Sequence, residues 1–133
     1  MDGYESYVSL KTAKMLKGAG FDWRCHCGFD AKDKECYAFN SSINWNDGTT
    51  KCCSQPTLET AQRWLRGVHA INIDIKSTIT GKFGFEAHFI SEAVRQAKGF
   101  NNGWLALSSC MFNTYEEALE IGIQNCLTVL LKK

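Results

Sequence analysis

The fold of this chain is decided by residues 71–89, which read Ile71-Asn72-Ile73-Asp74-Ile75-Lys76-Ser77-Thr78-Ile79-Thr80-Gly81-Lys82-Phe83-Gly84-Phe85-Glu86-Ala87-His88-Phe89. Isoleucines and then phenylalanines take every second position over most of this stretch, which is the period of a strand with one buried face. Thr80-Gly81-Lys82 supplies a turn between the two runs. We therefore predict an antiparallel hairpin whose apolar face, with Ile79 included, forms the floor of the core.

Three helix starts surround this hairpin, because a capping hydroxyl precedes an apolar periodic segment at Ser9, Thr57 and Thr114. The first helix is expected to end at about Lys17, and the last begins with a capping box formed by Thr114 and Glu117. The predicted buried stripes consist of Leu10, Ala13 and Leu16 in the first helix, of Leu58, Ala61, Trp64, Leu65 and Val68 in the second, and of Leu119, Ile123, Cys126, Leu127 and Leu130 in the third.

Shorter patterns fill the segments between the helices. Residues 23–40 predict a second hairpin that turns at residues 30–34. Residues 41–55 are polar with a turn at Asn46-Asp47-Gly48, although Ile43 and Trp45 could extend the second strand or form a short third one. Residues 91–98 suit a turn or two of helix, and residues 104–107 favour one more strand.

Together these patterns predict a single α+β domain over residues 1–133. Its expected architecture is a two-layer sandwich, with an antiparallel sheet of about four or five strands and three helices in the order α-ββ-α-ββ-α. The helix-plus-hairpin unit recurs, but capping and burial impose such patterns on unrelated helices, so we do not interpret it as a duplication.

Composition and charge argue against several classes of function. Lys and Arg number 15 and Asp and Glu number 14, so the net charge of +1 does not favour nucleic acid or anionic lipid as a partner. No apolar stretch approaches the roughly 18 residues of a membrane span, and we do not expect a signal peptide at Met1-Asp2-Gly3-Tyr4-Glu5, because acidic residues stand where one would need positive charge. We expect a cytoplasmic protein that does not bind membranes, with its seven cysteines as free thiols.

A cysteine cluster is the one candidate for a metal site. Cys25, Cys27 and Cys36 are soft ligands of the kind that zinc prefers, and Cys27 and Cys36 would face each other across the predicted hairpin. The spacing is not that of a zinc knuckle, however, and thiols on strands are commonly buried as small apolar groups. We predict no metal site and keep these three cysteines as an alternative.

Catalytic machinery is not evident in the sequence. No cysteine lies in a local signature with His26, His69 or His88, and the glycine spacings of nucleotide-binding loops are absent. His69 ends the second helix, where a cation would interact favourably with the dipole, and His88 takes the solvent side of its strand. We therefore predict a protein that is not an enzyme and has no cofactor.

Two tryptophans are candidates for ligand binding. Trp45 and Trp104 lie in or beside polar loops, and exposed aromatic residues dominate binding hot spots. The alternative is that each packs against an edge of the sheet. Arg63 and Arg66 of the second helix would hold the phosphate of a nucleotide stacked on either indole.

Residues 56–73 read Pro56-Thr57-Leu58-x-x-Ala61-Gln62-x-Trp64-Leu65-Arg66-x-x-His69-x-Ile71-x-Ile73, and residues 113–122 read Asn113-Thr114-Tyr115-Glu116-Glu117-Ala118-Leu119-Glu120-x-Gly122. This half of the chain resembles uncharacterised small proteins encoded by phages and mobile elements of gut bacteria. That group has no established activity, so the resemblance implies a genomic setting in which an accessory protein acts on host machinery or host defence.

These observations lead to a prediction of function. We expect a non-enzymatic phage or mobile-element accessory protein that binds a host or viral macromolecule, with a protein as partner, in host takeover or counter-defence. One alternative is a binding protein or sponge for a signalling nucleotide. A second is a zinc-dependent nucleic-acid-binding protein built on Cys25, Cys27 and Cys36. The sequence does not decide whether the protein forms a homo-oligomer.

Overall fold

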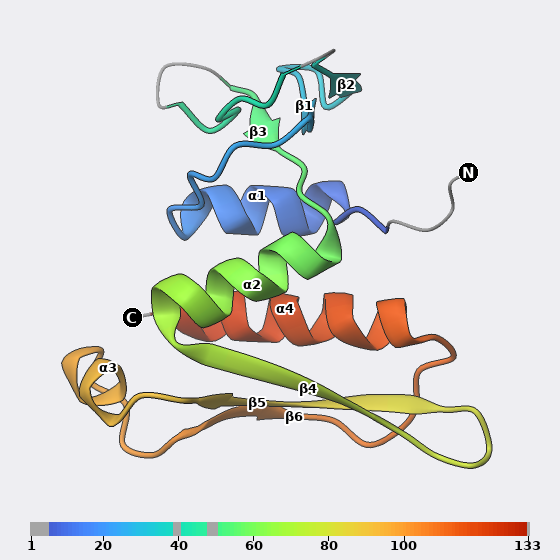
Figure 1. Cartoon of the computed structure of the whole chain (residues 1–133), viewed down its shortest axis with the longest axis vertical. Coiled ribbons are helices and arrows are strands. Elements are labelled where there is room, and N and C mark those ends of the chain that lie inside the picture. The colour runs from blue at the N-terminus through green and yellow to red at the C-terminus, as the bar shows by residue number, and fades with distance from the viewer. Residues whose placement is uncertain (1–5, 39–40, 48–50, 133) are drawn as a thin grey trace. The chain divides into compact units, whose positions relative to one another are not determined.

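The computed structural model describes residues 6–38, 41–47 and 51–132 of the chain (Figure 1). The chain divides into two compact units, residues 1–61 and residues 62–133. The elements of the first unit are α1 (Leu10–Gly18), β1 (Cys27–Phe29), β2 (Glu35–Tyr37) and β3 (Cys53–Ser54). Helix α2 (Leu58–His69) begins in the first unit and ends in the second. The second unit continues with β4 (Ile71–Ser77), β5 (Phe83–Phe89), α3 (Glu92–Ala97), β6 (Trp104–Leu107) and α4 (Tyr115–Leu131).

The first unit contains a small antiparallel sheet in the order β2-β1-β3. The turn between β1 and β2 lies at residues 30–34, as predicted, and the Asp30 carboxylate fixes it by accepting the backbone N–H groups of Lys32 and Lys34 at 2.8 and 3.0 Å. Those two hydrogen bonds favour the ionised carboxylate, and they lower the pKa of Asp30. A local side-chain contact of this kind is why the turn could be predicted from the sequence.

Helix α1 packs beside β3 in the same unit. Ser9 is its N-cap, because the hydroxyl of Ser9 accepts the N–H of Thr12 at 3.3 Å. Ala13 and Leu16 are fully buried, as their spacing predicts, while the Lys17 ammonium donates to the Cys52 carbonyl at 2.6 Å. The predicted cap and the central positions of the first buried stripe are therefore confirmed.

The second unit consists of the antiparallel sheet β4-β5-β6 with α4 along one of its faces (Figure 1). In the β4–β5 hairpin, Ile73 pairs with Ala87 and Ile75 pairs with Phe85. Ile71, Ile73, Phe85, Ala87 and Phe89 are buried, together with Leu119, Ile123, Cys126 and Leu127 of α4. The alternation of residues 71–89 thus forms the apolar floor that the sequence predicts.

Close packing of α4 on this floor depends on Gly122. A Cβ atom added at Gly122 would lie 3.2 Å from Cγ of Phe85 and 3.3 Å from Cγ2 of Ile73, which is tighter than most van der Waals contacts. The N-cap of the helix is Thr114, whose hydroxyl accepts the N–H of Glu117 at 3.0 Å. The Glu117 carboxylate in turn accepts the N–H of Asn113, so the predicted capping motif is present with its return bond one residue earlier.

The α+β class is confirmed, but several details of the predicted architecture are wrong. The strands form two separate three-stranded sheets and not one sheet of four or five. The turn or two of helix predicted at residues 91–98 is confirmed as α3, and with it the described part of the chain has four helices and not three. Strand β3 was not predicted. It pairs with β1, and the Trp45 N–H donates to the Ser54 hydroxyl while the Asn46 side chain accepts the Ser54 N–H. These contacts join residues far apart in the chain, so local periodicity does not predict them.

Two apolar residues do not have the burial that their pattern predicts. Ile79 is fully exposed at the tip of the β4–β5 hairpin, because the chain already turns at Thr78, whose N–H donates to the Lys82 carbonyl. Val68 is also exposed on α2. The predicted turn at residues 46–48 lies partly outside the described residues. The prediction of a single domain over residues 1–133 stays a prediction.

Candidate functional site

The open face of the β4–β5–β6 sheet, on the side away from α4, carries the candidate site. The strand register places its residues in two cross-strand rows. One row joins Asn72 of β4, His88 of β5 and Trp104 of β6, and the next joins Asp74, Glu86 and Leu107. A bulge between the two β5–β6 pairs lets Trp104 and Leu107 share this face although three residues separate them. We call these six residues the open-face cluster.

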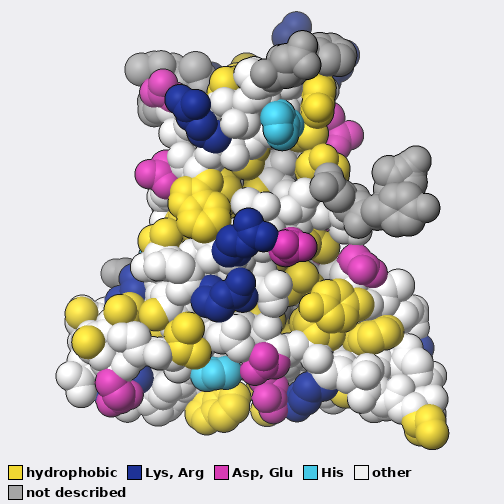
Figure 2. All heavy atoms as spheres, in the orientation of Figure 1, with side chains coloured by type: hydrophobic (Ala, Val, Ile, Leu, Met, Phe, Trp, Pro, Cys, Tyr) yellow, Lys and Arg dark blue, Asp and Glu magenta, His cyan; other side chains and the backbone are white. Residues whose placement is uncertain are grey.

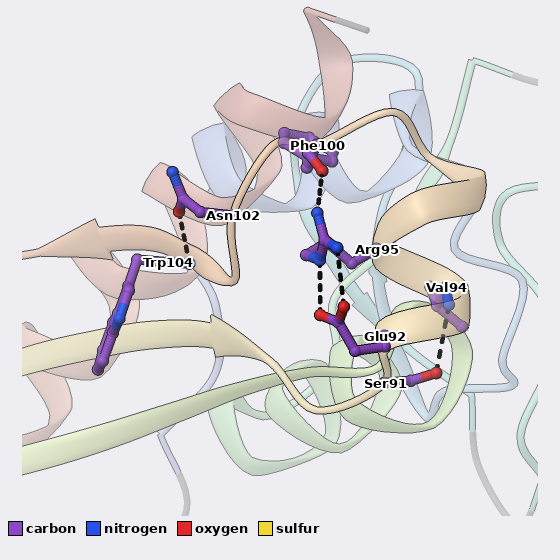
Figure 3. Close-up of polar contacts among 7 residues, drawn as sticks. All are labelled: Ser91, Glu92, Val94, Arg95, Phe100, Asn102 and Trp104. Carbon is purple, nitrogen blue, oxygen red and sulfur yellow. Dashed lines mark hydrogen bonds and ion pairs between the residues drawn. The ribbon is translucent and has the colours of Figure 1, made fainter.

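Trp104 is the most distinctive member of the open-face cluster. Its side chain is 62% exposed, and its ring centroid lies 5.3 Å from that of His88 at an interplanar angle of 52°. The backbone N–H of Trp104 donates to the Asn102 side chain at 2.9 Å, and the indole extends away from that bond (Figure 3). Leu107 in the next row is 67% exposed. Two large apolar side chains are therefore displayed on a strand whose backbone is fixed.

Helix α3 and the loop after it hold the chain that leads into Trp104 (Figure 3). The Arg95 guanidinium donates to both carboxylate oxygens of Glu92, at 2.7 and 2.8 Å, and also to the Phe100 carbonyl. These hydrogen bonds lower the pKa of Glu92 and raise that of Arg95. Phe100 packs its ring against Phe89 at 5.2 Å. Arg95 therefore ties α3 to the loop that positions Trp104.

Two carboxylates face each other across the middle of the cluster. Asp74 and Glu86 are direct cross-strand partners, an arrangement of like charges that destabilises a sheet. The Lys76 ammonium contacts the Glu86 carboxylate at 2.8 Å, while Asp74 accepts the Asn72 side-chain amide at 2.9 Å. Figure 2 shows a histidine beside a large apolar side chain along this sheet, with acidic and basic side chains next to them. The cluster thus combines an apolar anchor with an excess of negative charge.

The other predicted binding residues lie elsewhere. Trp45 belongs to the first unit, where its indole N–H donates to the Cys25 carbonyl at 2.9 Å and its ring covers Gly28. Arg63 and Arg66 are exposed on α2. Because Trp45 and Trp104 belong to separate units, the structure does not assign them to one site. A binding role for Trp45, Arg63 or Arg66 stays a prediction.

The expected geometry of the cysteine alternative is wrong. Cys27 lies opposite Tyr37 and Cys36 lies opposite Gly28, so Cys27 and Cys36 are offset by one residue and point to opposite faces of the sheet. In the described residues, no group of three or more His, Cys, Asp or Glu side chains is arranged to hold a metal ion. All seven cysteines are free thiols. Burial raises the pKa of Cys25 to about 11 and that of Cys126 to about 12, which makes these two thiols poor nucleophiles.

His69 does not act as the cationic helix cap that its position predicts. Its ring contacts Trp64 edge-on at 4.8 Å, and neither ring nitrogen has solvent contact or a hydrogen-bond partner among the residues that the structure describes. Burial lowers the pKa of His69, and the nearby charge of Lys98 lowers it further. The neutral imidazole is therefore favoured. The helix ends at His69, and the next residue, Ala70, adopts a left-handed conformation with φ of 55°.

The sequence singles out Trp104 as a binding candidate, which stays a prediction, and it does not single out the rest of the open-face cluster. Asn72, Asp74, Glu86 and His88 are the polar positions of the same alternation that predicts the hairpin, so a solvent-facing strand explains them without a function. The signal that distinguishes them is their register, since it places two acids side by side and one of them, Glu86, diagonal to an exposed indole. That register follows from the length of the β4–β5 turn and from the β5–β6 bulge, which a sequence pattern does not reveal.

Comparison with known proteins finds similar sequences among the snaclecs. A snaclec salmorin chain of Gloydius brevicauda is 26% identical over 105 residues, which cover 78% of this chain and 58% of that protein. Snaclec A11 of Macrovipera lebetinus is 26% identical over 103 residues, which cover 77% of this chain and 58% of that protein. The chain thus spans little more than half the length of these relatives. No family model matches the chain, and no solved structure matches it.

These comparisons correct three predictions. The expected relationship to proteins of phages and mobile elements is wrong, because the similar proteins are C-type lectin-like proteins of snake venom. The predicted role as a phage accessory protein is wrong for the same reason, and neither the nucleotide sponge nor the zinc-dependent nucleic-acid binder gains support. The predicted cytoplasmic location is also wrong, since the relatives are secreted. None of the helices in the described residues has the length and apolar character needed to cross a membrane.

Proposed function

We propose that this chain is a non-enzymatic protein-binding protein that docks its partner on the open-face cluster. Trp104 is the anchor, with Leu107 beside it. The proposal is carried by one observation: Trp104 and Leu107 are exposed together on one strand, on the face of the sheet that α4 does not cover. Tryptophan is the residue type most enriched among the side chains that dominate binding energy.

The surroundings of Trp104 support the same function. Asn72, Asp74, Glu86 and Lys76 form a polar margin next to the apolar pair, and an interface with an apolar centre and a polar rim has this composition. The similar chain of snaclec salmorin is by its name one subunit of that protein, and is therefore a member of an assembly. For this chain, we propose that the open-face cluster is the surface through which a second copy or another protein is held.

Alanine substitution of Trp104 tests the proposal. We expect wild-type protein to retain a defined partner from an extract of the cells that produce it, or to associate with a second copy in native mass measurements. Trp104→Ala should reduce that association at least tenfold, as expected for truncation of a hot-spot residue. Its midpoint of thermal unfolding should change little, since the side chain is mostly in solvent.

Tyr37→Ala is the matched control, because Tyr37 is also a large and exposed side chain, at 54%, but belongs to the first unit. That variant should bind as wild type does. If Trp104→Ala bound its partner as tightly as wild type, the proposal would be refuted.

A further inference from the structure

We infer that the partner places an arginine side chain on the open-face cluster, with its guanidinium between the indole of Trp104 and the carboxylates of Asp74 and Glu86. This inference rests on the proposed function and names the chemistry of the partner. It is argued from the register of the three strands, from the charges that this register brings together, and from the shape of the guanidinium group that would bind them.

The geometry of the two rows fits one long side chain. Glu86 is the central residue of its row, with Asp74 directly opposite on β4 and Leu107 directly opposite on β6. Trp104 pairs with His88, two residues along β5, and is therefore the diagonal neighbour of Glu86. Direct cross-strand neighbours have Cβ atoms about 5 Å apart and diagonal neighbours about 7–8 Å apart. A single guanidinium group can therefore reach the indole and a carboxylate at once.

The charges on this face are only partly balanced from within the chain. Lys76 is the ion-pair partner of Glu86, whereas Asp74 accepts a hydrogen bond from the neutral amide of Asn72. Within the described residues, no Lys or Arg forms an ion pair with Asp74. Two acids and one base therefore leave a negative charge on this face: Asp74 on β4 lies beside Glu86, and Glu86 on the central strand is the diagonal neighbour of the exposed indole on β6. A cationic group of the partner is complementary to that charge, while a phosphate or a carboxylate would be repelled.

Arginine fits this environment better than lysine does. Its planar guanidinium can lie against an indole face, and its five N–H groups can bond two carboxylates at the same time. An ammonium group is a more strongly hydrated point charge that loses more on leaving water. The aliphatic part of the arginine side chain would cover Leu107, which is otherwise exposed to solvent.

The direct pairing of Asp74 with Glu86 gives the sheet no evident benefit. Like charges opposite one another weaken a strand pair, and the neutral amide of asparagine at position 74 would keep the contact with Asn72. An acid at this position is explained if it contacts a ligand. The same reasoning predicts that Asp74→Asn lowers affinity for the ligand without lowering the stability of the protein.

Three short peptides provide the test: acetyl-Ser-Gly-Arg-Gly-Ser-amide and the same sequence with lysine or glutamine in place of arginine. Each is titrated into the millimolar range against the full chain, and the signal of the Trp104 indole N–H is followed by NMR and assigned with Trp104→Phe. We expect the arginine peptide to shift this signal with at least fivefold higher affinity than the glutamine peptide. The lysine peptide should fall between them, and high salt should weaken the binding of both cationic peptides.

Variants separate the inference from the proposed function. Asp74→Asn and Glu86→Gln should each weaken binding of the arginine peptide at least fivefold, whereas Asp22→Asn removes an exposed carboxylate of the first unit and should change nothing. Equal binding of the arginine and glutamine peptides, no binding of either, or unchanged binding by Asp74→Asn would overturn the inference. If Trp104→Ala still lost the protein partner in that case, the proposed function would stand with a different partner chemistry. If Trp104→Ala kept the partner, the proposed function itself would fail.

Discussion

The ring of Trp45 lies directly against the backbone of Gly28. A Cβ atom added at Gly28 would be 2.2 Å from Cδ2 of the indole, far inside van der Waals contact. The indole cannot easily move away, because its N–H donates to the Cys25 carbonyl and the backbone N–H of Trp45 donates to the Ser54 hydroxyl. Gly28 is therefore required in the central strand of the first sheet, for reasons of space and not of backbone conformation.

Gly28→Ala should lower the free energy of unfolding by about 1–3 kcal/mol, the usual cost of forcing extra atoms into a packed site. Urea denaturation followed by circular dichroism measures this loss. A second variant, Gly28→Ala combined with Trp45→Leu, should show a smaller loss than the sum of the single substitutions, because removing the indole removes the clash.

Gly67→Ala is the matched control, since it makes the same chemical change at a glycine of α2 where an added Cβ meets nothing within 4 Å. Alanine favours a helix by about 1 kcal/mol relative to glycine, so this variant should raise the free energy of unfolding. Destabilisation by both substitutions would contradict the packing argument for Gly28.

Stability should fall as the solution is acidified through the titration of His69. Burial lowers its pKa in the folded protein, so between that value and about 6.5, the value for an unfolded chain, the unfolded state binds more protons. The stabilisation is fully present above pH 6.5 and is lost as pH falls through this window. The midpoint of urea denaturation should therefore be lower at pH 5 than at pH 7.5.

His69→Phe should remove most of this dependence, because a phenyl ring retains the edge-on contact with Trp64 but cannot bind a proton. The comparison is best made above pH 5, where the carboxylates are still ionised. A variant with the same acid sensitivity as wild type would assign the effect to another group.

Asp74→Asn should raise the free energy of unfolding slightly. Cross-strand pairs contribute roughly 0.2–1 kcal/mol, and the lower end applies here because Asp74 is exposed and screened by water. Thermal denaturation at low salt would measure the change, and it should shrink at high salt. A clear loss of stability would mean that the acid contributes to the sheet itself.

Removal of metal should leave the protein unchanged. Cys27 and Cys36 point to opposite faces of their hairpin and cannot share an ion without a change of register. Treatment with EDTA should therefore leave the midpoint of thermal unfolding where it was, and purified protein should carry far less than one equivalent of zinc. A decrease of several degrees on chelation would reopen the cysteine alternative.

Features that depend on neighbours in the sequence could be predicted. The caps at Ser9 and Thr114 and the turn at residues 30–34 form from side chains within a few residues of the backbone groups that they contact. The sequence also predicts the β4–β5 hairpin, because a strand with one buried face needs apolar residues at every second position, whichever element covers that face. The turn begins at Thr78, two residues before the Thr80-Gly81-Lys82 turn that the sequence predicts, and so Ile79 lies at the tip of the hairpin and not in the core.

Features that depend on distant contacts could not be predicted. Strand β3 pairs with β1, which lies more than 20 residues earlier in the chain, and Trp45 and Asn46 hold Ser54 in place. The candidate site shows the same limit. A tryptophan beside polar residues, such as Trp104, can be recognised as a binding candidate from the sequence. Asp74 and Glu86 become candidates only when the strand register places them together.

The absence of a side chain at Gly122 has a consequence on the far side of the sheet. Because Gly122 lets α4 pack closely on Phe85 and Ile73, strands β4 and β5, which carry Asp74 and Glu86 on their other face, are supported by the helix. A rigid backbone loses little conformational entropy when a partner binds, so the entropy cost of association comes mainly from ordering a few surface side chains. A small contact area can then give useful affinity. A substitution that weakens the packing of α4 on the sheet should therefore lower the affinity for the partner, although it lies on the opposite face.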